Sequence, residues 1–387
     1  MVGFKRFLLR VLRMGRLGFK LFGLPHKRIM VSQTESFFER RIYSSYSFRR
    51  YCTEEVSLEP PVLLSDNRYR AALNYTYEHF VLVVPHGRYY HKHPSVISPQ
   101  GYQLAIVSNH SELTQNEHVL FQELFIPKKR DFKGFGLVLS TANDLNYYHC
   151  LFQIPAKIWL LERVGIDWKG IDLFFVERAS GGFQDEIITS LGIEKFRLID
   201  LGKYPHVSCE RLMALPSFWK PEPWLCRKLV DTFLPQEDAH ATGPHRLFIS
   251  RSQARYRRIL EEEKLMRRLK QSGFQLVLLE GLSIGEQAQL FHQAQVVISA
   301  HGAALANLVF CRPETKVLEL RVAGHDADLS GVYEHLSSIC QLKHFTYLCE
   351  GKTNDYGTHP KFMDLLVDQV IVEEFIKEEV EHPNMVQ

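Results

Sequence analysis

Long runs of uncharged apolar residues are missing from this 387-residue sequence. A helix that spans a bilayer needs about 20 such residues, so the composition argues against an integral membrane protein. The two signs of charge nearly cancel, leaving a formal net charge of +3, which gives no reason to expect nucleic acid as a partner. The seven cysteines include no Cys-x-x-Cys pair, so we predict buried thiols in a reducing compartment and no metal site.

The chain does have enough residues for two domains, and it has a basic N-terminus. Its first 30 residues contain eight Lys or Arg and no acid. On a helix, at about 100° per residue, the apolar side chains gather on one face and the cations on the other. This pattern is typical of a segment lying on an anionic membrane surface. We therefore predict surface attachment through residues 1–24; the alternative is a helix docked on its own protein or an unstructured basic tail.

Between residues 80 and 201, short apolar runs typical of strands alternate with helical stretches. Such alternation indicates a parallel sheet covered by helices. The polar stretch 235–245 is rich in turn formers and predicts a linker. The predicted strands are 80–85, 104–108, 135–140, 171–177 and 197–201, and the predicted helices are 145–164 and 182–192.

The alternation is clearer after the linker and predicts a doubly wound nucleotide-binding sheet. Ser283 and Glu286 form a capping box at the start of one helix, and the apolar residues after His301 predict a buried helix. The predicted strands are 246–250, 274–280, 295–300, 316–320 and 343–348, and the other predicted helices are 259–272, 330–340 and 361–380.

Two segments that follow strands of this second sheet could bind an anion, because ligands of such sheets bind beyond the carboxyl ends of the strands. His301, Gly302 and Ala303 lie where the first N–H groups of a helix lack partners and small residues let a diphosphate approach. A tight strand-to-helix crossing is the alternative interpretation. Arg251 ends the first strand, and its planar guanidinium can bind two phosphate oxygens.

Four further residues are candidates. Glu319 is predicted to end its strand, where its carboxylate either accepts hydrogen bonds from ribose hydroxyls or is merely solvated. Asn307, from the predicted helix after His301, completes the nucleotide-sugar-binding set. In the first domain, His149 follows the strand 135–140 and could take a proton from an acceptor hydroxyl, with Asp144 as its neighbour or rival. A structural histidine among aromatic residues is the alternative.

Three segments resemble glycosyltransferase family 61 and the bacterial capsular-polysaccharide proteins grouped with it. They occur in the family's order: NYYHCLFQIPAKIWLLERVG, ISRSQARYRRILEEEKL and LSIGEQAQLFHQAQVVISAHGAALANLVFCRPETKVLEL. The resemblance implies a GT-B fold, in which two Rossmann-like α/β domains face each other across a cleft. It also implies inverting transfer from a nucleotide-sugar with no cofactor and no obligatory metal. His301, Gly302 and Ala303 would line the diphosphate pocket, Arg251 would serve the phosphates, and His149 would belong to the acceptor side.

The chain departs from the family at two positions. Many members carry an acid four residues after the histidine, where this chain has Gln153. They also commonly have Asn where this chain has Glu261. His149 or Asp144 is then left as the base.

We therefore predict transfer of a sugar from a nucleoside diphosphate onto a glycan or glycolipid acceptor in surface polysaccharide synthesis, in the cytoplasm or on the inner face of the membrane. The predicted parts are a membrane-surface segment (1–30), an acceptor-side domain (31–240), a nucleotide-sugar domain (244–350) and a C-terminal helix (360–380). Gln153 is also compatible with an assembly protein that binds the nucleotide-sugar but has lost transfer. A dehydrogenase is disfavoured, because no Gly-x-Gly-x-x-Gly follows a strand.

Overall fold

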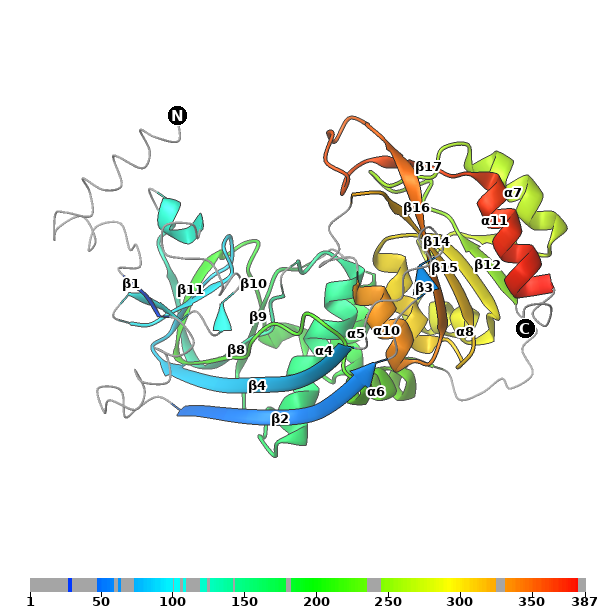
Figure 1. Cartoon of the computed structure of the whole chain (residues 1–387). Coiled ribbons are helices and arrows are strands. Elements are labelled where there is room, and N and C mark those ends of the chain that lie inside the picture. Colours follow the sequence, from blue (N-terminus) through cyan, green and yellow to red (C-terminus); the bar gives the residue numbers. More distant parts are fainter. Residues whose placement is uncertain are drawn as a thin grey trace. The chain divides into compact units, whose positions relative to one another are not determined.

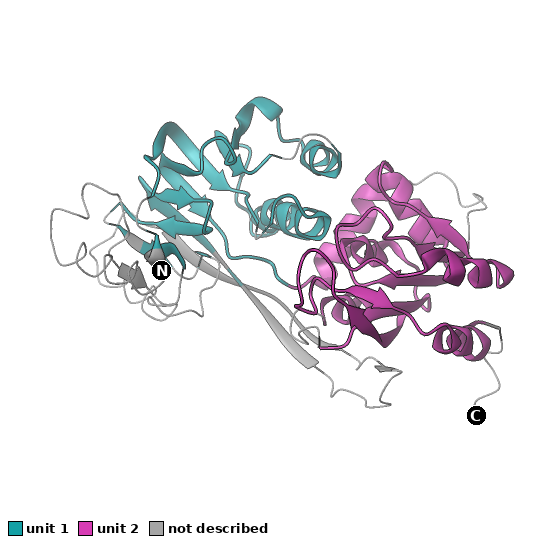
Figure 2. Ribbon diagram, turned by 90° about the horizontal axis from the view of Figure 1, so that it is seen from above, with its two compact units in different colours: residues 1–54, 76–219 teal, residues 55–75, 220–387 magenta. Residues whose placement is uncertain are grey.

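A computed structural model describes most of the chain. It covers residues 27–29, 47–58, 62–63, 73–99, 101–104, 107–108, 119–123, 126–141, 143–178, 182–234, 245–324 and 331–381. The chain divides into two compact units, unit 1 (residues 1–54 and 76–219) and unit 2 (residues 55–75 and 220–387), shown in Figure 2. The predicted membrane-surface segment 1–24 and residues 235–244 of the predicted linker lie outside the described residues.

Unit 1 is built on a mixed sheet. Its strands β8 (Arg130–Val138), β9 (Leu173–Val176), β10 (Leu198–Asp200) and β11 (His206–Ala214) run parallel, while β4 (Leu73–Pro85) and β5 (Arg88–Tyr90) run antiparallel to β11. Helix α4 (Tyr147–Arg163) follows β8 and α5 (Phe183–Ser190) follows β9, as the alternation predicts. The sheet is completed by β1 (Lys27–Ile29), β2 (Ser47–Leu58), β6 (Ser95–Ile97) and β7 (Tyr102–Leu104).

The strands of unit 1 differ from the predictions at several places, and β1, β2, β5 and β6 were not predicted. The predicted strand 104–108 is wrong, because β7 ends at Leu104. Strand β11 was not predicted at all, although it pairs with β4, β5 and β8. Its register shifts between Cys209 and Arg211, and such a bulge breaks the alternation by which a strand is recognised in a sequence.

Unit 2 contains the parallel sheet predicted from the second half of the sequence (Figure 1). Its strands lie in the order β13 (Gln275–Val277), β12 (Arg246–Ile249), β14 (Val296–Ala300), β15 (Lys316–Val322), β16 (Lys343–Lys352). The chain thus goes from β12 to one neighbour, β13, and then crosses back to the other, β14. This reversal makes the gap between β12 and β14 the switch point of a doubly wound sheet. β3 (Val62–Leu63) joins the sheet beside β16.

Helices cover both faces of this sheet (Figure 1). On one face α7 (Glu262–Gln271) and α11 (Gln369–Phe375) pack onto a core that includes Ile298, Leu320 and Phe345. On the other face lie α8 (Ile284–Gln293), α10 (Val332–Ile339) and the 3₁₀ helix η4 (Ala303–Phe310). Helix α6 (Pro223–Phe233) packs with α8 and η4, so the longer segment of unit 2 begins at Lys220, before the turn-rich stretch 235–245.

Three helix predictions in unit 2 need correction, whereas the capping box at Ser283 is confirmed. The helix after His301 is a 3₁₀ helix, although it is buried as expected. Helix α7 begins at Glu262, not at 259, because Ile259 forms a bridge with Leu365. The predicted helix 361–380 is a strand, β17 (Asp364–Leu366), followed by α11 and a π turn at Ile376–Glu381.

Candidate functional site

The switch point of unit 2 places two predicted segments side by side. Arg251 follows β12, and His301 with Gly302 follows β14, the strand that pairs with β12 in parallel. Ligands of doubly wound sheets bind beyond the carboxyl ends of the strands at this point, where the two connections diverge.

Arg251 lies directly against Gly302. A methyl group built on the Gly302 α-carbon would overlap the Arg251 guanidinium. The backbone of Gly302 is extended, with a φ of 173°, so the position requires glycine for close approach and not for backbone conformation. The guanidinium is held by two backbone carbonyls, because its Nε donates to Arg257 at 3.1 Å and its Nη2 to Tyr256 at 3.2 Å.

A second cation, Arg257, lies beside Arg251. Burial, and then the charge of Arg257, lowers the pKa of Arg251 to about 10, and burial also lowers the pKa of Arg257. Neither guanidinium forms an ion pair with a carboxylate within the described part of unit 2, whereas the next arginine, Arg258, pairs with Asp364 at 3.2 Å. The backbone of Arg257 is left-handed, with a φ of 58°, a conformation that costs energy for a residue with a side chain. Two adjacent cations that form no ion pair with a described carboxylate suit an anionic ligand.

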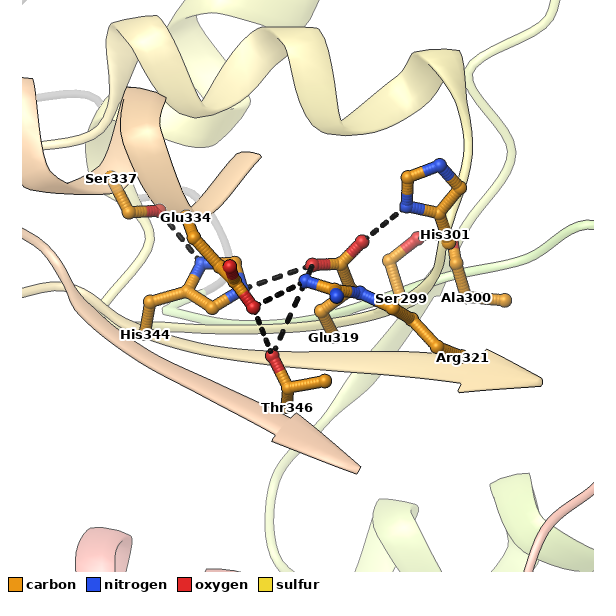
Figure 3. Close-up of polar contacts among 9 residues, drawn as sticks. All are labelled: Ser299, Ala300, His301, Glu319, Arg321, Glu334, Ser337, His344 and Thr346. Atoms are coloured by element: carbon orange, nitrogen blue, oxygen red, sulfur yellow. Dashed lines mark hydrogen bonds and ion pairs between the residues drawn. The ribbon is translucent and has the colours of Figure 1, made fainter. Parts of the chain in front are cut away.

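His301 lies above a buried ionic cluster centred on Glu319 (Figure 3). One Glu319 oxygen accepts from His301 Nδ1 at 2.5 Å, and the other accepts from Arg321 at 2.9 Å and from His344 at 3.0 Å. Burial alone would raise the pKa of Glu319, but Arg321 and His301 hold it well below its usual value. Burial lowers the pKa of His301, and Glu319 opposes that shift. The cluster therefore fixes the orientation of the His301 imidazole, whose Nδ1–H donates to the Glu319 carboxylate.

The prediction that Glu319 ends its strand is wrong. Strand β15 continues to Val322, and Glu319 is completely buried with both oxygens bonded inside the unit. This geometry suits support of His301 better than contact with a ribose. Carboxylates nearer Arg251 line a hollow of about 520 Å³ at the carboxyl end of β12, bounded by Ser250, Ser252, Glu261, Glu262, Glu263 and Leu276.

Ala303 and Asn307 both belong to η4, but Ala303 is at its start and Asn307 is buried further along it. Ala303 is its first residue and is half-buried, so its backbone begins the helix beside Gly302. Asn307 is completely buried, and its amide donates to Gln287 at 2.8 Å and to the carbonyl of Ala304 at 3.2 Å. These bonds join η4 to α8, which is a structural role.

In unit 1, His149 and Asp144 lie near the start of α4. Asn146 caps this helix by accepting from the His149 backbone N–H. The Gln153 amide nitrogen lies 2.9 Å from His149 Nδ1, and the rings of His149 and Trp219 meet edge-on at 6.0 Å. Burial lowers the pKa of His149, and the charge of Asp144 opposes the shift. Asp144 is fully buried; its carboxylate accepts from the backbone N–H groups of Thr141 at 2.5 Å and Glu177 at 2.9 Å.

Sequence reasoning missed several residues of these sites. Arg321 and His344 were not singled out, although Arg321 lies two residues after Glu319 and therefore on the same face of its strand. The sequence also contains one Asp-x-Asp motif, Asp326-Ala327-Asp328, which lies outside the described residues. Among the residues that are described, no group of three or more His, Cys, Asp or Glu side chains could hold a metal ion.

The comparison with protein families agrees with this geometry. The family model described as Glycosyltransferase 61 matches residues 81–318, which is more than half of the chain. The chain therefore belongs to glycosyltransferase family 61, and it is a glycosyltransferase. A search among curated proteins gave no match to it. None of the helices in the described regions combines the length and apolar character needed to cross a bilayer.

Proposed function

We propose that this glycosyltransferase binds a nucleoside-diphosphate sugar with its diphosphate at the switch point of unit 2. The observation that carries the proposal is the pair Arg251 and Arg257, two cations without a carboxylate partner in the described part of unit 2, packed against Gly302 at the start of η4. Both guanidiniums would contact phosphate oxygens, and the backbone at Gly302 and Ala303 would add N–H donors.

The same groups would promote the reaction. Negative charge grows on the diphosphate as its bond to the anomeric carbon breaks, and preorganised cations stabilise that charge without reorganising. His301 would contribute in its protonated form, in which Nε2–H donates to a phosphate oxygen while Nδ1–H donates to Glu319. We propose a metal-independent transfer with inversion, in a GT-B arrangement, because these side chains offer the positive charge that a metal ion would otherwise supply.

For the acceptor we propose a glycan or glycolipid of surface polysaccharide synthesis, bound at the edge of unit 1 that carries His149. A polar donor beside an aromatic ring, as in His149 and Trp219, is suited to a sugar acceptor. The enzyme would work in the cytoplasm, held at an anionic membrane surface by residues 1–24.

The direct test is turnover of a panel of UDP-, GDP- and CDP-sugars, followed as release of the nucleoside diphosphate. We expect release from at least one donor and a product of inverted anomeric configuration by NMR. Retention of configuration would contradict the inverting mechanism.

A second candidate is a nucleotide-sugar-binding assembly protein without transferase activity. It is favoured by one observation, the amide of Gln153 beside His149 in place of the family's usual acid. In that case a nucleoside diphosphate would raise the melting temperature, yet no donor of the panel would be consumed with any glycan acceptor.

A further inference from the structure

A second imidazole–carboxylate pair lies in unit 1, formed by His91 after β5 and Glu177 after β9. His91 Nε2 lies 3.2 Å from Glu177 Oε2, and its Nδ1 lies 3.2 Å from the hydroxyl of Ser140. Neither His91 nor Glu177 stood out in the sequence, although Glu177 is the last residue of the predicted strand 171–177 and directly follows the observed β9.

The two contacts of His91 are compatible with one tautomer of its ring. In the neutral ring Nδ1 accepts from the Ser140 hydroxyl, which places the ring proton on Nε2. This nitrogen faces a Glu177 oxygen 3.2 Å away. His91 thus lies where its Nε2–H can orient the Glu177 carboxylate.

Glu177 lies at the edge of the sheet where a ligand is expected. It directly follows β9, which pairs in parallel with β8, and the carboxyl ends of such strands form ligand sites. Asp144 ties this position to the start of α4, because it accepts from the backbone N–H of Glu177 at 2.9 Å. The Gln184 amide also bridges the carbonyls of Asp144 and Glu177, at 3.0 and 2.9 Å.

Glu177 can accept a proton, whereas its neighbours are poorly arranged to do so. Its side chain is 31% exposed, and within the described residues its only ion pair is with His91. Asp144 is fully buried and bonded to two backbone N–H groups. In His149, the Gln153 amide donates to Nδ1, so the ring proton lies on Nε2 and the neutral ring has no free lone pair.

We propose that Glu177 is the general base of this transferase and that His91 is its positioning residue, an assignment that rests on the proposed function. The Glu177 carboxylate would take the proton of the acceptor hydroxyl while that oxygen bonds the anomeric carbon. The bond from this carbon to the diphosphate breaks, and the diphosphate leaves with the electron pair. His91 would keep the carboxylate oriented through its Nε2–H, and His149 would donate a hydrogen bond to the acceptor.

Azide separates the chemistry of a base from binding and folding. It is an anionic nucleophile without a proton to remove, so it needs no base, and it is small enough for the space left by Glu177→Ala. The donor is the UDP-, GDP- or CDP-sugar that the wild type consumes. When its sugar passes to water or to a hydroxyl acceptor, Glu177→Ala should release nucleoside diphosphate about 10²- to 10⁴-fold more slowly than the wild type. Sodium azide should restore release and yield the glycosyl azide.

Variants of His91 and a matched pair complete the test. His91→Ala should show a smaller loss that azide also restores, and His91→Gln, which keeps an N–H donor, should recover part of the rate. The control is Glu123→Gln, which changes a similar pair, since Glu123 Oε1 lies 2.7 Å from His93 Nε2. Its release rate should stay close to that of the wild type if the loss in Glu177→Ala depends on the position of this carboxylate at the end of β9, and not on the loss of an imidazole–carboxylate pair as such.

The outcomes distinguish this proposal from the proposed function. A folded Glu177→Ala with wild-type release would overturn the assignment of the base. So would a folded variant with normal diphosphate affinity that azide cannot restore. A wild type that releases no diphosphate from any donor would instead contradict the proposed function, and this inference would be overturned with it.

Discussion

Gln153 decides which nitrogen of His149 carries the proton. Its amide nitrogen donates to Nδ1 at 2.9 Å, and a donor at this place makes Nδ1 an acceptor. A carboxylate in the same position would accept from Nδ1–H and leave Nε2 bare, which is the form of a base. The side chain at position 153 thus determines the role of His149 Nε2. With Gln153 this nitrogen is a donor, and with a glutamate it would be an acceptor.

Nuclear magnetic resonance can read this exchange directly. In protein with ¹⁵N-labelled histidine, the His149 signals should show Nε2 protonated in the wild type and Nδ1 protonated in Gln153→Glu, with a higher pKa in the variant. His149→Asn identifies the signals by their disappearance. The same tautomer in both proteins would contradict our assignment of the hydrogen bond.

For single residues, the sequence predicted their place in the fold better than their hydrogen-bond partners. The rule that ligands bind at strand ends brought Arg251 and Gly302 into one site, and the structure places them in contact. The surroundings of Glu319 were not predictable in the same way. Its partner Arg321 lies two residues away on the same strand. His301 and His344 come from distant parts of the sequence, and only the folded sheet brings them to Glu319.

Among the elements, α4 is fixed to its sheet by a buried cation. The Lys157 ammonium donates to the carbonyls of Val138 and Leu139 at 3.2 Å each and to that of Ser140 at 2.5 Å. These carbonyls end β8, so Lys157 holds the segment that leads to Asp144 and His149. Burial lowers the pKa of Lys157 to about 8.

Lys157→Met should lower the free energy of unfolding by about 1–3 kcal/mol, because buried carbonyls lose their donor. Between pH 8 and the usual lysine pKa of 10.5, the unfolded wild type binds more protons than the folded one. Its stability therefore rises with pH in that window, and the gap between wild type and variant should widen. Urea unfolding at pH 7.5 and 9.5 measures this difference in stability. A difference that narrows with pH would contradict the lowered pKa of Lys157.

Helices and strands were predicted correctly where a short stretch of sequence carries the whole hydrophobic pattern. The parallel strands of unit 2 are short apolar runs, and all five of their predicted positions are confirmed, including that of β13, which is not buried. The helix predicted at 361–380 is confirmed only from Gln369 onward, because Leu365 and Leu366 lie in β17 although they fit a helical stripe equally well. Their pairing with β16 and with Ile259 is a long-range contact that no local pattern contains.

For the whole molecule, metal dependence tests which positive charge stabilises the leaving diphosphate, the two guanidiniums or a bound metal ion. If Arg251 and Arg257 stabilise the leaving diphosphate, release of nucleoside diphosphate should persist in EDTA. A loss that Mg²⁺ or Mn²⁺ reverses would show a metal clamp, and the first residues to test would be Asp326 and Asp328. If the transfer is independent of metal, Asp326→Asn should leave the rate of nucleoside diphosphate release unchanged.

Membrane attachment is the other property of the whole chain. Deletion of residues 2–24 should release the protein from anionic liposomes without changing its affinity for a nucleoside diphosphate. Raised salt should weaken sedimentation of the full chain, since exposed charges are screened. Neutral phosphatidylcholine liposomes are the control. Equal sedimentation of both proteins with anionic liposomes would rule out this segment as the anchor.

The central claim is that Arg251 and Arg257 form a diphosphate site. It is tested most directly by calorimetric titration of UDP, GDP and CDP into wild type, Arg251→Ala and the exposed neighbour Arg255→Ala. For the nucleotide that binds best, Arg251→Ala should weaken binding by about 1.5–3 kcal/mol, the contribution of a hydrogen bond to a charged group. Arg255→Ala should bind like the wild type, and the parent nucleoside should bind both variants equally. Unchanged diphosphate affinity in a folded Arg251→Ala would remove Arg251 from the site and contradict the account.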